Sequence, residues 1–218
     1  MKKIICVFSG GLDSTVLLYK LVNEGYDVTA VSFNYGQRHT KELEYAAKTC
    51  GNLNVKHKLI DISSIVDIFA GSALTDAVDV PAGHYEEESM KVTVVPNRNS
   101  IFLNLAMAYG IGKRIYNLSY GAHAGDHEIY PDTRPAFVEA FNKLAKTVDY
   151  EPIDVITPFL NIRKEDIVKE GARLGVPFNN TWSCYSGGKI HCGVCGTCTE
   201  RKEAFQLAGI KDPTEYEE

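Results

Sequence analysis

The feature that most constrains the fold is a short apolar run at residues 4–8 that passes directly into a glycine turn. The turn reads Ser9-Gly10-Gly11-Leu12-Asp13-Ser14-Thr15, and the apolar residues Val16-Leu17-Leu18 follow it. This order predicts a strand, a tight turn and an amphipathic helix. A helix N-terminus attracts anions, glycines let the backbone approach them, and hydroxyl groups add donors. The segment therefore predicts a phosphate site.

This phosphate loop belongs to neither of two familiar types. A Walker loop has a lysine after its last glycine, where this chain has Leu12-Asp13, and a dinucleotide fingerprint needs a third glycine. An ordinary turn with Asp and Ser as helix caps is the plain alternative. The turn resembles the pyrophosphate loop of the N-type ATP pyrophosphatases. That resemblance implies ATP binding by Phe8, Ser9, Gly10, Gly11, Leu12, Asp13, Ser14, Thr15, Val16, Leu17 and Leu18.

Strand and helix patterns alternate along the rest of the chain. We expect strands at residues 27–33, 54–60, 114–120 and 153–157, and helices at residues 41–50, 101–111, 135–148 and 164–174. Gly51 is expected to stop the helix at 41–50, and Asn99 or Ser100 to cap the helix at 101–111. The alternation predicts an α/β fold with a doubly wound, mainly parallel sheet that binds ligands beyond the carboxyl ends of its strands.

We expect two parts, an ATP-binding α/β domain at residues 1–180 and a metal-binding segment at residues 181–218 packed on it. Residues 71–91 form a long irregular stretch that includes Glu86-Glu87-Glu88, which predicts a mobile cover. Residues 212–218 are polar and acidic, which predicts a frayed, solvated tail.

The composition limits the classes of function. The chain has 218 residues, of which 44% are hydrophobic and 23% charged, which is typical of a globular protein and excludes a disordered one. Its net charge of −5 argues against a nucleic-acid partner, because such proteins show a basic face. No apolar stretch is long enough to cross a membrane. We therefore expect a cytoplasmic protein with a small-molecule substrate, no nucleic acid and no membrane partner.

Four of the six cysteines lie close together near the C-terminus, at Cys184, Cys192, Cys195 and Cys198. Their spacing suits a structural Zn²⁺ site closed by four thiolates. An iron–sulfur cluster, reactive thiols in a CxxC pair and disulfides are the alternatives. His191 is a further candidate ligand, although four cysteines already complete a tetrahedron. Cys6 and Cys50 are expected to be small core residues.

Several polar side chains predict a substrate site. Arg98 precedes the most apolar helix and can clamp a phosphate or a carboxylate, although a surface role is the alternative. Tyr130, Asp132 and Arg134 lie in one loop and suit a planar heterocycle, with stacking by Tyr and acceptance of hydrogen bonds by Asp. Lys164 begins a helix, where it either reaches a phosphate or belongs to a solvated face.

Taken together, the motifs resemble those of the 7-cyano-7-deazaguanine synthase family, which forms a nitrile in queuosine biosynthesis. Asn97 stands where we expect glycine in the family motif Val-Pro-x-Arg-Asn. The resemblance covers nearly the whole chain, and its motifs are Phe8–Thr15, Tyr35–His39, Val95–Asn99, Tyr130–Arg134, Thr157–Phe159 and Thr181–Cys184.

The resemblance implies an adenine nucleotide alpha hydrolase-like fold and an ATP-dependent ligase. Its partners would be ATP, 7-carboxy-7-deazaguanine and ammonia, its cofactors structural Zn²⁺ and Mg²⁺ bound with ATP, and its assembly a homodimer. A tRNA thiolase that uses reactive cysteines is the alternative, but it needs a basic face. Ammonia-dependent synthetases share the loop without the cysteines, and a non-catalytic zinc module would leave the loop without a role. No catalytic base can be named from the sequence.

Overall fold

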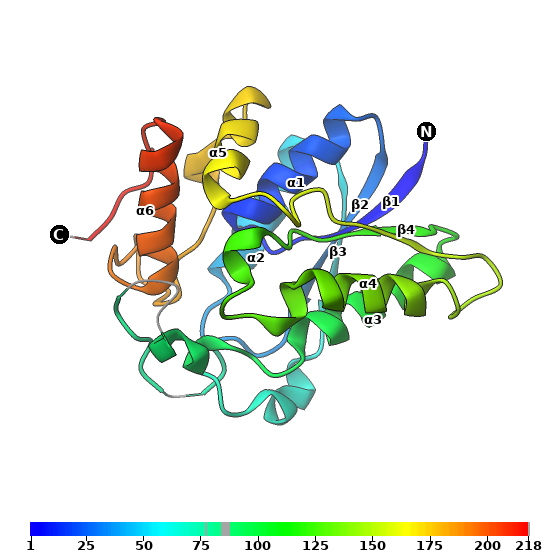
Figure 1. The fold of residues 1–218 in the computed structure, drawn as a ribbon, viewed down its shortest axis with the longest axis horizontal. Coiled ribbons are helices and arrows are strands. Elements are labelled where there is room, and N and C mark those ends of the chain that lie inside the picture. The colour runs from blue at the N-terminus through cyan, green and yellow to red at the C-terminus, as the bar shows by residue number, and fades with distance from the viewer. Residues whose placement is uncertain (77, 84–87, 218) are drawn as a thin grey trace.

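The computed structural model describes residues 1–76, 78–83 and 88–217. Its centre is a parallel sheet of five strands in the order β3-β2-β1-β4-β5 (Figure 1). The strands are β1 (Lys3–Val7), β2 (Asp27–Asn34), β3 (Lys56–Asp61), β4 (Asn117–Ser119) and β5 (Asp154–Ile156). The α-helices are α1 (Leu12–Asn23), α2 (Lys41–Asn52), α3 (Arg98–Gly112), α4 (Pro135–Ala145), α5 (Lys164–Arg173) and α6 (Gly196–Ala208). The predicted α/β fold with a doubly wound parallel sheet is confirmed.

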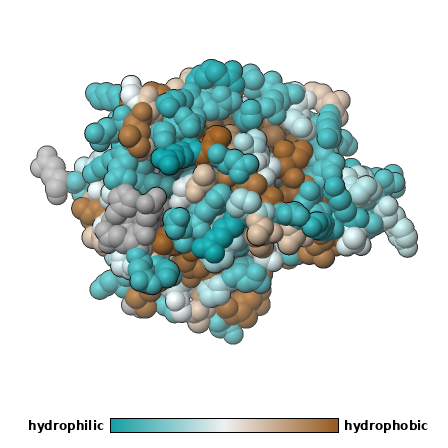
Figure 2. Space-filling view, in the orientation of Figure 1, coloured by the Kyte–Doolittle hydropathy of each residue, from teal (hydrophilic) through white to brown (hydrophobic). Residues whose placement is uncertain are grey.

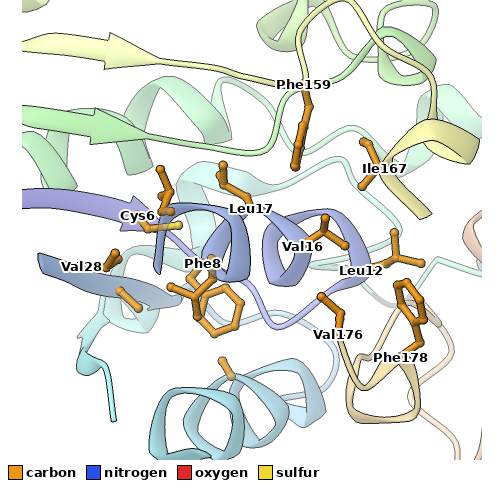
Figure 3. Packing of buried hydrophobic residues seen from close by; sticks show 14 of the residues in the cluster. Cys6, Phe8, Leu12, Val16, Leu17, Val28, Phe159, Ile167, Val176 and Phe178 are labelled. Carbon is orange, nitrogen blue, oxygen red and sulfur yellow. The ribbon is translucent and has the colours of Figure 1, made fainter. Parts of the chain in front are cut away.

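Helices cover both faces of the sheet and create two cores. Successive residues of β1 point to opposite faces, so that Ile4 and Cys6 join one core and Ile5 joins the other. The first core contains buried residues of α1, α2, α5 and α6, and Figure 3 shows Val16 and Leu17 of α1 within it. The second core contains residues of α3 and α4. Burial of each large side chain contributes about 1.5–3 kcal/mol, so both layers anchor the sheet.

The helix boundaries differ from the predicted ones for local reasons. α2 continues through the exposed Gly51 to Asn52, because one glycine costs a helix only about 1 kcal/mol. α3 begins at Arg98, three residues before the predicted start, because Asn97 in the left-handed conformation (φ 54°) precedes it. The predicted caps at Asn99 and Ser100 are therefore wrong, since both lie inside the helix.

The prediction of a frayed tail is wrong. Tyr216 donates a hydrogen bond to Asp212 at 2.6 Å, and the N–H of Glu217 donates to the carbonyl of His191 at 2.8 Å. Asp212 accepts from the fully buried Arg201 of α6 at 3.1 Å. Because a buried guanidinium needs a carboxylate partner, this ion pair holds the tail against α6.

The predicted cover at residues 71–91 lies partly outside the described residues, including Glu86 and Glu87. Within its described part, Ala73, Leu74 and Met90 are buried. Among the described residues, none of the helices combines the length and the apolar character that crossing a bilayer requires. On the face drawn in Figure 2, polar residues predominate and apolar residues form smaller patches between them.

Candidate active site

A cavity of about 240 Å³ lies at the carboxyl ends of β1, β2 and β4. The chain order reverses between β1 and β4, and such a reversal is where open α/β sheets bind ligands. The loop after β1, the residues beyond β2, the start of α3 and the cysteine-rich segment all line the cavity. The cavity therefore lies beyond the carboxyl ends of the strands, where the sequence predicts that ligands bind.

The glycine turn forms one wall of the cavity. Gly11 caps α1 in an extended conformation, and its N–H donates to the hydroxyl of Ser9 at 3.2 Å. The hydroxyls of Ser9 and Ser14 lie 3.0 Å apart. The turn therefore brings a helix N-terminus and two hydroxyls to the cavity, which is a suitable arrangement for a polyphosphate. The lining residues of this segment are Phe8, Ser9, Gly11, Leu12, Asp13 and Ser14.

Gly10 lies where the phosphate loop packs closely against α2. Its φ is +86°, and an added Cβ would lie 2.3 Å from the carbonyl oxygen of Glu42 and 2.8 Å from the nitrogen of Ala46. The carbonyl of Gly10 accepts from the N–H of Trp182 at 3.1 Å. Gly10 therefore allows α2 and the cysteine-rich segment to pack directly on the phosphate loop.

The last four residues of the predicted ATP segment lie beneath the loop. Thr15 donates to the carbonyl of Gly11 at 2.7 Å, which stabilises the turn. The side chains of Thr15, Val16, Leu17 and Leu18 are 0% exposed, and none of them lines the cavity. Any contribution of these side chains to ATP binding is therefore indirect, through support of the loop.

A buried chain of charges connects the phosphate loop to α6. The ammonium group of Lys164 lies 3.2 Å from a carboxylate oxygen of Asp13 and 2.5 Å from one of Glu200. Burial opposes the charged forms, but these contacts raise the pKa of Lys164 and hold the pKa of Asp13 well below its usual range. Lys164 lines the cavity, so the interpretation of this residue as part of a solvated face is wrong.

His123, which follows β4, extends this charge network. Its Nε2 atom lies 3.4 Å from Asp126 and 3.7 Å from Asp13, and its Nδ1 atom accepts from the N–H of Gly125 at 3.1 Å. Burial disfavours the charged ring, but the carboxylates of Asp126 and Asp13 raise the pKa of His123 to about 9. The Nδ1 atom accepts this hydrogen bond only in the neutral ring, whose proton then lies on Nε2 and faces the two carboxylates. One potential ligand atom from each of His123, Asp126 and Glu200 lies within 4.8 Å of the others, and the carboxylate oxygens of this group suit a divalent ion.

Arg98 lies at the start of α3 and lines the cavity. Its guanidinium donates to the hydroxyl of Tyr35 at 3.4 Å. Asp132 accepts from the backbone N–H and the side-chain amide of Asn99, both at 3.1 Å, and so caps α3. Asn97 adopts the left-handed conformation, which asparagine tolerates nearly as well as the glycine of the family motif. The substitution therefore leaves Arg98 directed to the cavity.

The other predicted heterocycle contacts lie outside the cavity lining. Tyr130 is buried, and its hydroxyl lies 3.0 Å from the hydroxyls of both Thr93 and Tyr185. The exposed Arg134 donates to the backbone carbonyls of His127 and Glu128, at 2.7 Å and 3.2 Å. Tyr130, Asp132 and Arg134 thus hold the loop behind the cavity, and the structure does not bring them to its surface.

Sequence patterns do not single out two acidic residues of the site, Glu42 and Glu200. Glu42 lies in the first turn of α2 and lines the cavity beside Arg98. Glu200 lies in α6, two residues beyond Cys198, where it contacts the cavity-lining Lys164 and lies close to Asp126. The one sequence feature that could have indicated Glu42 as a site residue is its position just after Tyr35–His39, the segment that follows a strand.

The four C-terminal cysteines converge as predicted. The sulfur atoms of Cys184, Cys192, Cys195 and Cys198 all lie within 4.8 Å of one another. Backbone N–H groups donate to two of these sulfur atoms. That of Cys184 accepts from Ser186 at 3.4 Å and from Cys192 at 3.3 Å, and that of Cys192 accepts from Cys195 at 3.4 Å. The separation fits a single tetrahedral ion at about 2.3 Å from each sulfur. A four-iron cluster is wider and would spread the thiolates farther apart.

His191 does not join this cluster, because its Nε2 atom accepts from the N–H of Ser183 at 3.1 Å. Its ring lies 4.3 Å from that of Trp182. Burial, aided by the charge of Arg201, lowers the pKa of His191 to about 4, so the ring is a neutral acceptor. The indole N–H of Trp182 donates to the carbonyl of Cys184 at 2.8 Å, and its backbone N–H donates to the carbonyl of Gly10. The cysteine cluster is therefore packed directly on the phosphate loop.

Comparisons with known proteins agree on one family. The model of the queuosine biosynthesis protein QueC family matches residues 3–209. The 7-cyano-7-deazaguanine synthase of Pseudoalteromonas atlantica is 51% identical over 217 residues, which cover 100% of both chains. That of Caldicellulosiruptor saccharolyticus is 55% identical over 214 residues, covering 98% of this chain and 95% of the relative.

Solved structures share the fold at lower identity. The U34-tRNA thiolase NcsA from Methanococcus maripaludis, with its [4Fe-4S] cluster, has a TM-score of 0.53 at 18% identity and covers 94% of this chain and 65% of its own. The NMN synthetase from Francisella tularensis has a TM-score of 0.52 at 17% identity and covers 96% of this chain and 78% of its own. At such identities the likeness shows the fold alone.

Proposed function

The chain belongs to the queuosine biosynthesis protein QueC family, and on this premise we propose that it converts 7-carboxy-7-deazaguanine and ammonia to 7-cyano-7-deazaguanine at the expense of ATP. The observation that carries the proposal is the shared cavity. The phosphate loop at Ser9–Ser14, the cationic Lys164 and the guanidinium of Arg98 all line it. A nucleotide and an anionic acceptor can therefore meet there.

The chemistry requires activation of the carboxylate twice. Attack of a carboxylate oxygen on the α-phosphate of ATP gives an acyl adenylate and releases pyrophosphate. Ammonia adds to the acyl carbon and AMP leaves, which gives the amide after loss of a proton. The amide oxygen then attacks the α-phosphate of a second ATP and releases a second pyrophosphate. Departure of that oxygen with AMP, together with loss of the two amide protons, leaves the nitrile. Each step transfers an oxygen to AMP, so the products contain no free phosphate from ATP.

We assign separate roles in this reaction to the residues of the cavity. We assign the β- and γ-phosphates to the N–H groups of the phosphate loop, the hydroxyls of Ser9 and Ser14, and Lys164. Arg98 is assigned to the substrate carboxylate, since a guanidinium fork matches a carboxylate. Positioning and charge stabilisation can carry much of the rate, which is consistent with the lack of an evident general base.

Mg²⁺ is the proposed counter-ion of ATP, and it supplies positive charge that neutralises the polyphosphate. The carboxylates of Asp13, Asp126 and Glu200 fit its preference for oxygen ligands. Zn²⁺ is the proposed structural ion of the four cysteines, on the basis of their close separation and four-thiolate composition. With all four thiolates committed to one ion, the cluster does not suit the alternative chemistry of a thiolase.

We further propose that the protein works in the cytoplasm as a homodimer, with ammonia as the free nitrogen donor and without nucleic acid. The net charge of −5 supports a small-molecule acceptor over tRNA. The division into an ATP-binding part at residues 1–180 and a metal-binding part at 181–218 is retained as a proposal. Light scattering of the purified protein tests the assembly, because a monomer at micromolar concentration would overturn it.

Mass spectrometry tests the reaction itself. The purified protein is incubated with 7-carboxy-7-deazaguanine, ammonium and Mg-ATP, and the products are compared with a reaction that lacks ammonium. The proposal expects the nitrile, with AMP and pyrophosphate, only in the complete reaction. Absence of the nitrile with a metal-loaded, folded protein would overturn the proposal.

A further inference from the structure

Glu42 occupies an unusual position for a carboxylate. It lies in the first turn of α2 and lines both the main cavity and a small side pocket that shares Tyr35, Gln37 and Arg98 with it. Aromatic rings form the adjoining wall, where Phe33 stacks on Phe102 with centroids 4.2 Å apart. A carboxylate therefore faces a space whose aromatic wall suits a flat ring.

This carboxylate lacks donors. Within the part of the chain that the structure describes, neither a hydrogen bond nor an ion pair reaches the carboxylate oxygens of Glu42. Burial raises the pKa of Glu42 to about 7, and the charge of Arg98 opposes this only in part. Removing a carboxylate from water without donors costs free energy. A ligand that brings donors to Glu42 would recover that cost.

We propose that Glu42 determines specificity for the substrate heterocycle, by accepting hydrogen bonds from two adjacent N–H groups on the pyrimidine edge of its ring. The inference rests on the proposed function. 7-Carboxy-7-deazaguanine has a ring N–H beside an exocyclic amino group, and a carboxylate accepts from two such donors at once. Arg98 lines the same cavity and is available to the carboxylate of the substrate.

ATP would not satisfy Glu42 equally well. The pairing edge of adenine has one amino group beside a ring nitrogen that is an acceptor. A carboxylate placed against that edge would gain one hydrogen bond and would bring its second oxygen against a lone pair. Two parallel donors are found in guanine-like rings, so the chemistry favours the acceptor substrate over the nucleotide.

Steady-state kinetics of Glu42→Gln test this assignment. The amide keeps the shape of the side chain but offers only one acceptor, so one substrate donor faces an amide donor. We expect the KM for 7-carboxy-7-deazaguanine to rise about tenfold to a hundredfold while the KM for ATP changes less than about twofold. The matched control is Glu44→Gln, an exposed residue in the same helical turn, which should leave both constants unchanged.

A second substrate makes the test independent of stability. The wild type should discriminate against the analogue without the 2-amino group, and Glu42→Gln should lose most of that discrimination. An unchanged KM for the heterocycle, or a KM that rises for ATP instead, would overturn the role of Glu42. If the wild type makes no nitrile from the carboxylate, the proposed function fails, and direct binding of the heterocycle by calorimetry still tests Glu42: weaker binding by the variant supports its role and equal binding refutes it.

Discussion

The ammonium group of Lys164 lies 2.5 Å from the carboxylate of Glu200, and this contact joins the phosphate cavity to the helix that begins at the cysteine cluster. Lys164 is the first residue of α5, and α5 packs against α6. Lys164, a cation that lines the cavity, is thus positioned by a residue two places beyond Cys198 of the cysteine cluster. The cysteine cluster and a residue that positions the cavity's lysine therefore lie on one helix.

Substitution of Glu200 by Gln should impair the use of ATP. The change removes the closest carboxylate from Lys164. The ammonium group can then shift toward Asp13 and neutralise that carboxylate in place of phosphate. We expect the KM for ATP to rise about tenfold, with a smaller effect on the KM of the heterocycle and with metal content unchanged. Steady-state kinetics and elemental analysis provide the measurements. Glu139→Gln, which breaks a surface pair with Lys143 at 2.7 Å, is the control.

An unchanged KM for ATP in the Glu200→Gln protein would contradict this arrangement. Loss of the metal would instead show that Glu200 acts through the fold.

Removal of the metal should weaken both the fold and ATP binding. Cys195 caps α6 and Cys198 lies in its first turn, so loss of the ion releases the start of the helix that carries Glu200. Structural zinc sites contribute on the order of 10 kcal/mol. We expect Cys195→Ser to lower the metal content, the melting temperature and the affinity for ATP together. Elemental analysis, thermal unfolding and calorimetry measure the three effects.

The control for the metal is Cys50→Ala, which removes a buried thiol of α2 remote from the cluster. It should keep its metal. A Cys195→Ser protein that binds ATP normally after losing its metal would refute the link between the two sites.

Gly10→Ala should be strongly destabilising. The new Cβ would lie 2.3 Å from a backbone oxygen of Glu42, so α2 must move away from the loop. Gly25→Ala is a matched control, because φ is similar, +81° against +86°, and nothing lies within 4 Å of its added Cβ. We expect the control to cost about 1 kcal/mol from backbone strain and Gly10→Ala to cost several times more. Denaturant unfolding measures both, and equal costs would contradict the packing described.

Glu42 should make the stability depend on pH. Burial raises its pKa from 4.5 in the unfolded chain to about 7 in the folded protein. Between these values the folded protein holds a proton that the unfolded chain has released, so the free energy of unfolding falls as pH rises. The charge of Arg98 opposes the effect only in part, and the phenol of Tyr35, whose pKa is raised above its ordinary value, is uncharged in this range.

The side chain of the variant Glu42→Gln does not titrate, so this contribution to the pH dependence of stability is absent. The stability of the variant relative to the wild type should therefore rise by about 2–3 kcal/mol between pH 5 and pH 8. Urea unfolding at both pH values measures the difference. A difference that does not change with pH would show that Glu42 titrates normally.

Local patterns predicted most of the strands and helices, because the phosphate turn and the alternation of apolar runs are encoded within short segments. The four cysteines could be placed together for the same reason, since three lie within one short stretch. Glu200 could not, because its contact with Lys164 joins residues 36 positions apart whose meeting depends on the packing of α5 on α6. The prediction for the tail was wrong because it depends on the ion pair between Asp212 and the buried Arg201 of α6, which no local sequence pattern reveals.

Candidate substrate residues show the same limit. Arg98 and Lys164 lie at helix starts beside the cavity, and sequence reasoning found both. Tyr130, Asp132 and Arg134 form a polar loop that suits a binding site equally well by composition. Their side chains form hydrogen bonds to other groups of the protein. Only the three-dimensional packing shows whether such a loop lines the cavity or supports the residues that line it.

The most direct test of the central claim follows the substrate oxygens. 7-Carboxy-7-deazaguanine labelled with ¹⁸O at both carboxylate oxygens is converted with ammonium and ATP, and the AMP, pyrophosphate and nitrile are analysed by mass spectrometry. Two successive adenylations place one labelled oxygen in each of two AMP molecules for every nitrile formed, and none in pyrophosphate. Label in inorganic phosphate or in water, or a single AMP per nitrile, would contradict the account.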